Sequence, residues 1–123
     1  MTACVKHAAH AMVEGGKGGS IICTASVAGK MEGDDGLQDY AITKNAVVGL
    51  VRTGSCELGK YGIRDNCVSP GAVATPMTME CFGMKDKESA EEAFSTHSLK
   101  GKVLKVIMWL MLCCFLPNRP VVW

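Results

Sequence analysis

Two short β-rich segments on either side of one long helical pattern constrain the fold of this chain most strongly. Ser20–Ala25 is a continuous apolar run, and Ile63–Ser69 is a second strand candidate that stops before a proline. Between them, Asp39–Gly59 has apolar residues at helical spacing and ends at a glycine. A strand that is apolar along its whole length is typical of a parallel sheet with both faces covered. We therefore predict a strand–helix–strand unit with parallel strands.

Two further helical patterns flank this unit. Thr2–Glu14 is rich in alanine, begins at a threonine that can cap a helix and is followed by two glycines. Lys85–Ser95 is a polar helix candidate, and the stretch between it and the second strand, which contains Pro76, is predicted as a loop. The order helix, strand, helix, strand, helix indicates an α/β protein. Two strands alone form a poor sheet, so we expect this pair to need neighbouring strands.

Charge and cysteine content limit the classes of function. The chain has 123 residues and a formal net charge of +1, which predicts no nucleic-acid-binding surface and no polybasic membrane patch. Its seven cysteines include no C-x-x-C pair, so they predict neither a zinc site nor a disulfide framework. Free thiols of this kind, with no secretory signal, indicate a reducing, cytoplasmic location.

Three residues suggest chemistry at the edge of the predicted sheet. Tyr40 and Lys44 form a Y-x-x-x-K pair, whose spacing puts both side chains on one face of the predicted helix. A free tyrosine titrates at about pH 10, and a nearby ammonium favours its phenolate, so such a pair can exchange a proton with an alcohol. Ser26 follows the first strand at its carboxyl end, where ligands bind in open α/β sheets. A Y-x-x-x-K pair by itself is more often just two surface residues of a helix.

Three motifs in this order resemble the short-chain dehydrogenase/reductase family. They are Ser20–Gly29 (SIICTASVAG), Tyr40–Leu50 (YAITKNAVVGL) and Tyr61–Thr78 (YGIRDNCVSPGAVATPMT). The similarity covers about residues 4–105 and is greatest to the plant NAD-dependent alcohol dehydrogenase branch, which includes secoisolariciresinol dehydrogenase and tropinone-reductase-like enzymes. The resemblance implies a partial Rossmann-like, doubly wound parallel sheet whose first βαβαβ half is missing.

The resemblance also implies roles for the three residues at the sheet edge. Tyr40 would be the general acid/base, and Lys44 would stabilise its phenolate and bond the ribose hydroxyls of the nicotinamide cofactor. Ser26 would orient the substrate oxygen and stabilise negative charge that develops on it. Tyr40 and Lys44 would therefore belong both to the catalytic and to the cofactor-binding set.

Four residues after the second strand complete the cofactor site that the resemblance implies. They would line the nicotinamide end of NAD, or of NADP as the alternative cofactor, with no metal ion: Pro70, Gly71, Val73 and Thr75. The segment Met77–Ser95 would shape an apolar substrate pocket. The helices 2–14 and 39–59 would form the homo-oligomer interface that is usual in the family.

The implied reaction is NAD(P)-dependent oxidation of a secondary alcohol, or reduction of the ketone, on a hydrophobic plant-type metabolite. The sequence contains no G-x-x-x-G-x-G phosphate-binding turn, so we expect this chain to be truncated and weakly active or inactive. The alternative is a non-catalytic fragment that binds an intact homologue, or a pseudogene product. These alternatives stay open at the level of sequence.

One position departs from the family inside a predicted strand. Asp65 stands where the family usually has valine, and strand alternation puts it on the same face as Ile63 and Cys67. A buried, unpaired carboxylate costs on the order of several kcal/mol or becomes protonated. Gly54, within the long helix, adds a separate cost of about 1 kcal/mol relative to alanine.

The final segment does not match the family pattern. We expect residues 1–105 to form the partial domain with the catalytic centre, and residues 106–123 to be an aberrant tail. One codon choice for Val106–Pro117 encodes a family-like helix in a shifted frame, so our hypothesis is a frameshift or mis-splicing event. The apolar run Val106–Leu116 has 11 residues, fewer than the roughly 20 needed to span a bilayer. The alternative is a short helix that lies on a membrane surface.

Overall fold

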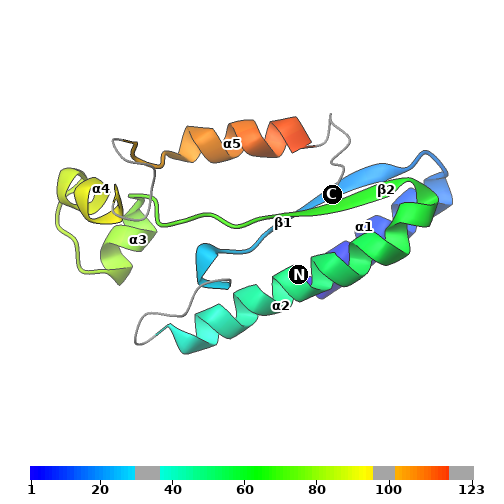
Figure 1. Cartoon of the computed structure of the whole chain (residues 1–123), viewed down its shortest axis with the longest axis horizontal. Helices are drawn as coiled ribbons and strands as arrows, with labels where there is room; N and C mark the ends of the chain where they lie inside the picture. Colours follow the sequence, from blue (N-terminus) through cyan, green and yellow to red (C-terminus); the bar gives the residue numbers. More distant parts are fainter. Residues whose placement is uncertain (30–36, 96–101, 117–123) are drawn as a thin grey trace. The chain divides into compact units, whose positions relative to one another are not determined.

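The computed structural model describes residues 1–29, 37–95 and 102–116. Residues 30–36 and 96–101, and residues 117–123 of the predicted tail, lie outside the described residues. The chain divides into two compact units, Met1–Ser69 with Cys113–Trp123 and Pro70–Leu112, which are described separately below. The elements of Figure 1 are, in chain order, α1 (Thr2–Gly15), β1 (Gly19–Thr24), η1 (Val27–Gly29), α2 (Gln38–Leu58), η2 (Gly59–Tyr61), β2 (Ile63–Val68), α3 (Pro76–Cys81), α4 (Lys87–Ser95) and α5 (Val106–Phe115).

The first unit contains the predicted strand–helix–strand arrangement. β1 and β2 pair in parallel, with Gly19 opposite Ile63 and Thr24 opposite Val68, and α2 connects them. β1 begins and ends one residue earlier than predicted, and β2 ends one residue earlier. The prediction of a partial α/β sheet is confirmed.

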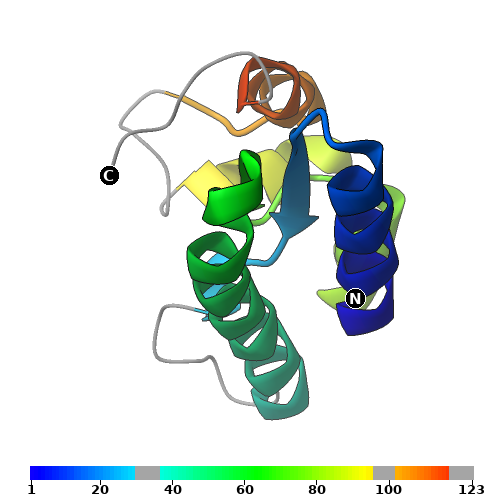
Figure 2. The ribbon, with the colours of Figure 1, turned by 90° about the vertical axis from the view of Figure 1, so that its right-hand side faces the viewer.

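Helices α1 and α2 cover the same face of this two-stranded sheet, as Figures 1 and 2 show. Each helix contributes a pair of apolar residues four positions apart, and β1 contributes the alternate residues Ile21 and Cys23, which are the periodicities expected of a helix face and a strand face. β2 contributes Ile63. The resulting core cluster consists of Val5, Ala9, Ile21, Cys23, Ala25, Val47, Val51 and Ile63. Because α2 packs on β2 through this core, the beginning of α2 is held near the end of β1, where the candidate site lies.

The sequence predicted the C-terminal end of α1 better than its N-terminal end. The helix ends at Gly15, one residue later than predicted, and the N–H of its C-cap residue Gly16 donates to the carbonyls of Met12 and Val13. The prediction that Thr2 caps the helix is wrong: Met1 is the N-cap residue, and Thr2 is already the first helical residue. The helix therefore begins one residue too early for the threonine side chain to act as its cap.

A close contact between two glycines joins the beginnings of the two strands. The Gly19 N–H donates to the Gly62 carbonyl over 3.3 Å. Gly18 has φ +68°, and a Cβ at this position would lie 2.6 Å from the Gly62 oxygen. Only glycine can satisfy both conditions, so this contact sets the register in which β1 and β2 begin.

The second unit contains a helix that was predicted as a loop. α3 spans Pro76–Cys81, with Thr75 as its N-cap and proline as its first residue. The Thr75 and Thr78 side chains form a reciprocal capping box, which accounts for a helix at this point. The predicted helix at 85–95 is confirmed as α4, and it begins after Asp86 because that carboxylate accepts the Ser89 N–H at 2.8 Å.

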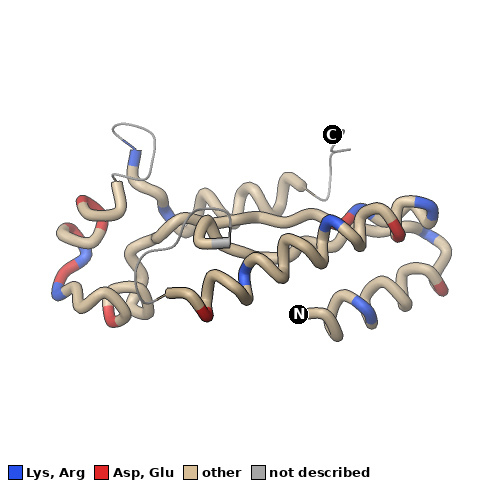
Figure 3. The backbone as a smooth tube through the Cα atoms, turned by 60° about the horizontal axis from the view of Figure 1, so that its bottom comes forward, with Lys and Arg blue, Asp and Glu red and all other residues tan. Residues whose placement is uncertain are grey.

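α5 is a ten-residue helix without a charged side chain, as the uniform tan of this segment shows in Figure 3. None of its residues is buried. Elsewhere along the described helices, basic and acidic residues alternate without forming a large region of one sign (Figure 3). Over residues 1–29, 37–95 and 102–116, no helix combines the length and apolarity required to cross a bilayer.

Candidate active site

Tyr40 and Lys44 lie near the beginning of α2 and share one face of it, as the spacing predicted. The Lys44 Nζ lies 5.4 Å from the centroid of the Tyr40 ring. The same ammonium donates a hydrogen bond of 3.3 Å to the backbone carbonyl of Thr24, the last residue of β1. One lysine therefore connects the tyrosine to the carboxyl end of the strand.

Ser26 follows that strand end by two residues. Its Oγ accepts a hydrogen bond of 3.2 Å from the Ala28 N–H, which fixes the side chain at the beginning of η1. η1 packs against α2, the helix that bears Tyr40 and Lys44. The three residues thus belong to adjoining segments of one unit, and Ser26 is the buried member of the three, at 9% exposure.

The exposure of the pair leaves it accessible to a ligand. Tyr40 is 44% exposed, and Lys44 is only half-buried. A lysine ammonium has three N–H donors. Among the described hydrogen bonds of Lys44, the Thr24 carbonyl takes one donor, so two are available for hydroxyl groups of a bound molecule.

Thr24 is the site residue that sequence reasoning missed. It contributes through its main-chain carbonyl, which every residue type has, so the identity of the side chain gives no signal. Position alone could have indicated it, because the last residue of a parallel strand places its carbonyl at the ligand-binding edge of the sheet.

The four residues expected at the nicotinamide end all lie in the second unit. They are partly buried: Pro70, Gly71, Val73 and Thr75. The Thr78 N–H donates to the Thr75 Oγ over 3.3 Å, while the Thr78 hydroxyl donates to the Val73 carbonyl. These hydrogen bonds give the segment a defined backbone, and its assignment to a cofactor stays a prediction.

Asp65 is buried as alternation predicted, and it lies apart from the Tyr40–Lys44 pair. It is 3% exposed, and neither carboxylate oxygen has a hydrogen-bond partner among the described residues. Burial raises the pKa of this carboxyl group to about 6. The side chain points toward α2, where a Cβ at Gly54 would lie 2.6 Å from Oδ2, so this glycine provides the space that Asp65 occupies.

No cluster of histidine, cysteine and acidic side chains suited to a metal ion occurs in the part of the chain that the structure describes. All seven cysteines are free thiols. The arrangement at the carboxyl end of β1 is therefore built from a phenol, an ammonium, a hydroxyl and backbone carbonyls. These groups can bind hydroxyls and exchange a proton with one.

A family model described as enoyl-(acyl carrier protein) reductase matches residues 1–116. Short-chain dehydrogenase reductase 3c from Arabidopsis thaliana is 46% identical over 119 residues, which cover 94% of this chain and 44% of that protein. The chain belongs to the short-chain dehydrogenase/reductase family. Its motifs at Ser26, Tyr40 and Lys44 had pointed to this family.

The chain is also similar to a plant dehydrogenase and to a ketoreductase of solved structure. A mitochondrial (−)-isopiperitenol/(−)-carveol dehydrogenase from Mentha piperita is 49% identical over 80% of this chain and 37% of that protein. The solved structure of actinorhodin polyketide ketoreductase with NADPH has a TM-score of 0.70 and 29% identity, over 85% of this chain and 42% of that chain. The chain thus spans about two fifths of the length of the relatives that it matches.

Proposed function

We propose that this chain contains the proton-transfer part of a nicotinamide-dependent dehydrogenase that oxidises a secondary alcohol or reduces the corresponding ketone. The observation that supports it most is the position of Lys44, whose Nζ lies 3.3 Å from the Thr24 carbonyl and 5.4 Å from the Tyr40 ring. This arrangement holds a cation beside a phenol at the carboxyl end of a parallel strand.

Tyr40 is the proposed general acid/base. In the oxidation, the alcohol proton moves to the Tyr40 Oη while the carbon loses a hydride; in the reduction, the same oxygen returns a proton to the carbonyl. The Lys44 ammonium, 5.4 Å from the centroid of the Tyr40 ring, places a positive charge beside the phenol that exchanges the proton. The partial exposure of the tyrosine allows an alcohol to approach.

Ser26 is proposed to position the substrate oxygen. Its Oγ accepts the Ala28 N–H, and the hydrogen bonds among the described residues give its own proton no acceptor, so this proton can be donated to another oxygen. A donor aimed at a carbonyl or alkoxide oxygen stabilises the charge that develops there. This role complements Tyr40, which handles the proton.

The residues present fit the nicotinamide-ribose end of NAD, with NADP as the alternative. The two remaining Lys44 donors suit the ribose hydroxyls, and the segment 70–75 is proposed to line the nicotinamide ring. When bound, the cofactor supplies the hydride acceptor or donor. The sequence contains no G-x-x-x-G-x-G turn for the pyrophosphate, so we propose that this chain binds the cofactor weakly.

The proposed substrate is a hydrophobic secondary alcohol. The segment that follows the cofactor residues is rich in large apolar side chains, including Met77, Met79, Phe82 and Met84. The carveol dehydrogenase relative is named for an apolar cyclic alcohol, which supports the same substrate class. The free thiols favour a reducing, cytoplasmic location for the reaction.

Binding of nicotinamide riboside tests this proposal, because the compound contains the ring and the ribose but no phosphate. We expect it to shift the amide NMR signals around Ser26, Tyr40 and Lys44 of the labelled full chain. K44M should weaken binding about tenfold or more, whereas K6M, which removes an exposed lysine of α1, should leave it unchanged. Equal binding by the wild-type chain and K44M would contradict the proposal.

A second proposal is that the chain acts without catalysis, as a partner of an intact homologue. It is favoured by a hollow of about 290 Å³ between α1 and α2, lined by residues such as Val5, Ala9, Leu50 and Leu58. These are the helices expected to form the family's oligomer interface. Co-purification with a full-length relative, lost on T53E substitution at an exposed residue that lines this hollow and without any nicotinamide binding, would favour this function over the enzyme.

A further inference from the structure

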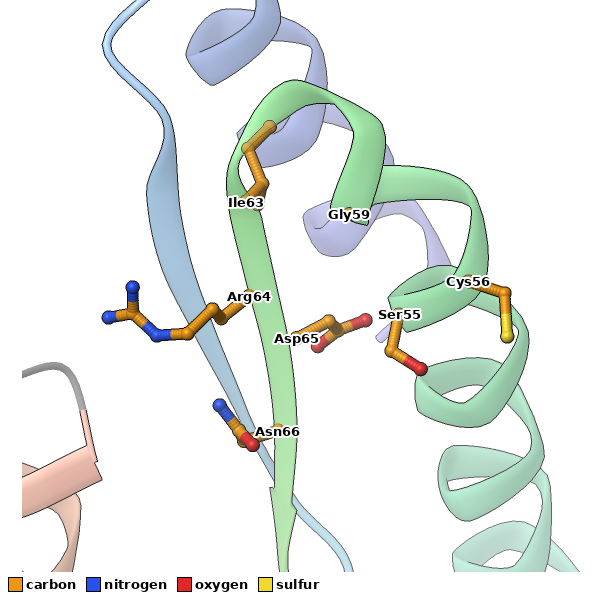
Figure 4. A pocket seen from close by; sticks show the side chains of 7 residues that line it. All are labelled: Ser55, Cys56, Gly59, Ile63, Arg64, Asp65 and Asn66. Carbon is orange, nitrogen blue, oxygen red and sulfur yellow. The ribbon is translucent and has the colours of Figure 1, made fainter. Parts of the chain in front are cut away.

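A second pocket lies between the C-terminal half of α2 and the outer side of β2, away from Tyr40 and Lys44. Its volume is about 290 Å³. Figure 4 shows the residues that line it: Ser55, Cys56, Gly59, Ile63, Arg64, Asp65 and Asn66. Four of them are consecutive in β2, so the pocket runs along the backbone of that strand.

This side of β2 is an open strand edge in the described part of the chain. β2 pairs with β1 on its other side, and the described sheet has no third strand. A strand edge presents backbone N–H and C=O groups that can pair with an added strand. The position of the pocket therefore suits an extended peptide lying alongside residues 63–66.

Asp65 supplies a buried carboxylate that can select among such peptides by their charge. It is 3% exposed, both of its oxygens lack a partner among the described residues, and it points into the space between β2 and α2. Arg64 and Asn66 point to the opposite face of the sheet (Figure 4). A buried carboxylate without a partner is strongly unfavourable. A cation that pairs with it therefore gains more binding free energy than it would at an exposed carboxylate.

We propose that the outer edge of β2 binds an extended peptide segment that places one basic side chain against Asp65. In an added strand, the residue opposite Asp65 points to the same face, with its Cβ about 5 Å away. A lysine or arginine at that position has its charged group within reach of the carboxylate.

A second copy of the chain is a poorer occupant of this edge. In an antiparallel pairing of two β2 strands, the face of Asp65 would receive Ile63, Asp65 or Cys67 from the other copy. None of these side chains is a cation. The carboxylate would therefore stay unpaired, and charge complementarity favours a basic peptide.

The test uses blocked five-residue peptides, Thr-Val-Lys-Val-Thr and the same peptide with norleucine in place of lysine. We expect the lysine peptide to bind the full chain at least tenfold more tightly at pH 7, and to shift the amide signals of residues 63–66 and 55–59. D65N and D65V should abolish the tenfold preference. D65V serves as the second variant because it removes the unpaired charge and should fold at least as well as the wild type.

The matched control is E57Q, which removes one negative charge from an exposed position of the same helix, outside this pocket. It should leave the preference intact. Equal affinity for the two peptides, an equal loss of preference in E57Q and D65N, or shifts located away from β2 would each overturn the proposal. Concentration-dependent shifts of residues 63–66 without peptide would also overturn it, because they would identify a second copy as the occupant.

Discussion

At the scale of single residues, spacing along the chain predicted some positions and not others. The relation of Tyr40 to Lys44 is a property of one helical turn, so it is readable from the sequence. The contact of Lys44 with the Thr24 carbonyl is not, because it depends on how α2 packs against β1. Likewise, Gly54 and Asp65 were each expected to reduce the stability of the fold. Only the packing of α2 on β2 shows that the missing side chain of Gly54 leaves the space that Asp65 occupies.

Asp65 makes the stability of the chain depend on pH. Its folded-state pKa of about 6 is above the usual value of 3.8, so the folded state binds this proton more tightly than the unfolded state. The contribution of this proton to the stability of the fold is therefore fully present below about pH 4 and is lost as pH rises to about 6 and above. The loss amounts to about 3 kcal/mol at most. The groups that interact with it electrostatically include the buried Cys23, whose pKa is raised by burial first and by Asp65 second.

We expect D65V to raise the free energy of unfolding at pH 7 by about 3 kcal/mol and to have a much smaller effect at pH 3.5. Urea unfolding of both proteins from pH 3.5 to 7.5 measures the difference between their free energies of unfolding. The effects of the other titrating groups are the same in both proteins and cancel in this difference. A difference that does not change with pH would show that the carboxylate is not buried as described.

The fit between Gly54 and Asp65 predicts that the effect of G54A on the free energy of unfolding has opposite signs in the wild-type chain and in D65A. Alanine normally stabilises a helix by about 1 kcal/mol relative to glycine. Here a Cβ would lie 2.6 Å from the Asp65 Oδ2, so G54A should destabilise the wild-type chain. In the D65A background the clash is absent, and G54A should stabilise by about 1 kcal/mol. The measurement is a double-mutant cycle of chemical unfolding, and additive effects would contradict the contact.

At the scale of elements, a helix or strand was predictable when it had a periodic pattern long enough to be distinctive. β1, α2 and β2 have such patterns, and their predicted bounds differ from the observed bounds by one residue. α3 has six residues, too few to show a period, and its signal is the cap formed by Thr75 and Thr78. A threonine followed by proline could have indicated it, since both residues favour the start of a helix.

The junction of the two strands gives a prediction at this scale. G18A should reduce the free energy of unfolding by about 2 kcal/mol or more, because the new Cβ would meet the Gly62 oxygen and the backbone has φ +68°. G49A, a matched change at a helical glycine whose Cβ would meet nothing within 4 Å, should be neutral or stabilising. Equal effects of the two substitutions in urea unfolding would show that the glycine contact does not set the register.

At the scale of the whole molecule, α5 is the part that the sequence pattern explained least. It is a helix of ten uncharged residues, most of them large and apolar, and none is buried. Neither a membrane span nor a fully packed core helix has this combination of length and exposure. An exposed apolar surface of this kind favours self-association.

We expect the chain to associate with rising concentration, and the pair I107E and M111K to suppress this. Both positions are more than half exposed, and the new residues form a favourable Glu–Lys pair four positions apart. Sedimentation velocity over a hundredfold range of concentration measures the effect. A wild-type chain that stays monomeric throughout would contradict it.

The proposed function depends on one spatial claim, that a phenol, an ammonium and a hydroxyl from three separate positions meet at the end of β1. Nuclear Overhauser spectroscopy of the labelled chain measures this directly. The account predicts cross-peaks from the Lys44 ε-methylene protons to the Tyr40 ring and to Thr24, and from the segment that begins at Ser26 to the first turns of α2. A spectrum in which Lys44 and Tyr40 show no contact with the end of β1 would contradict it.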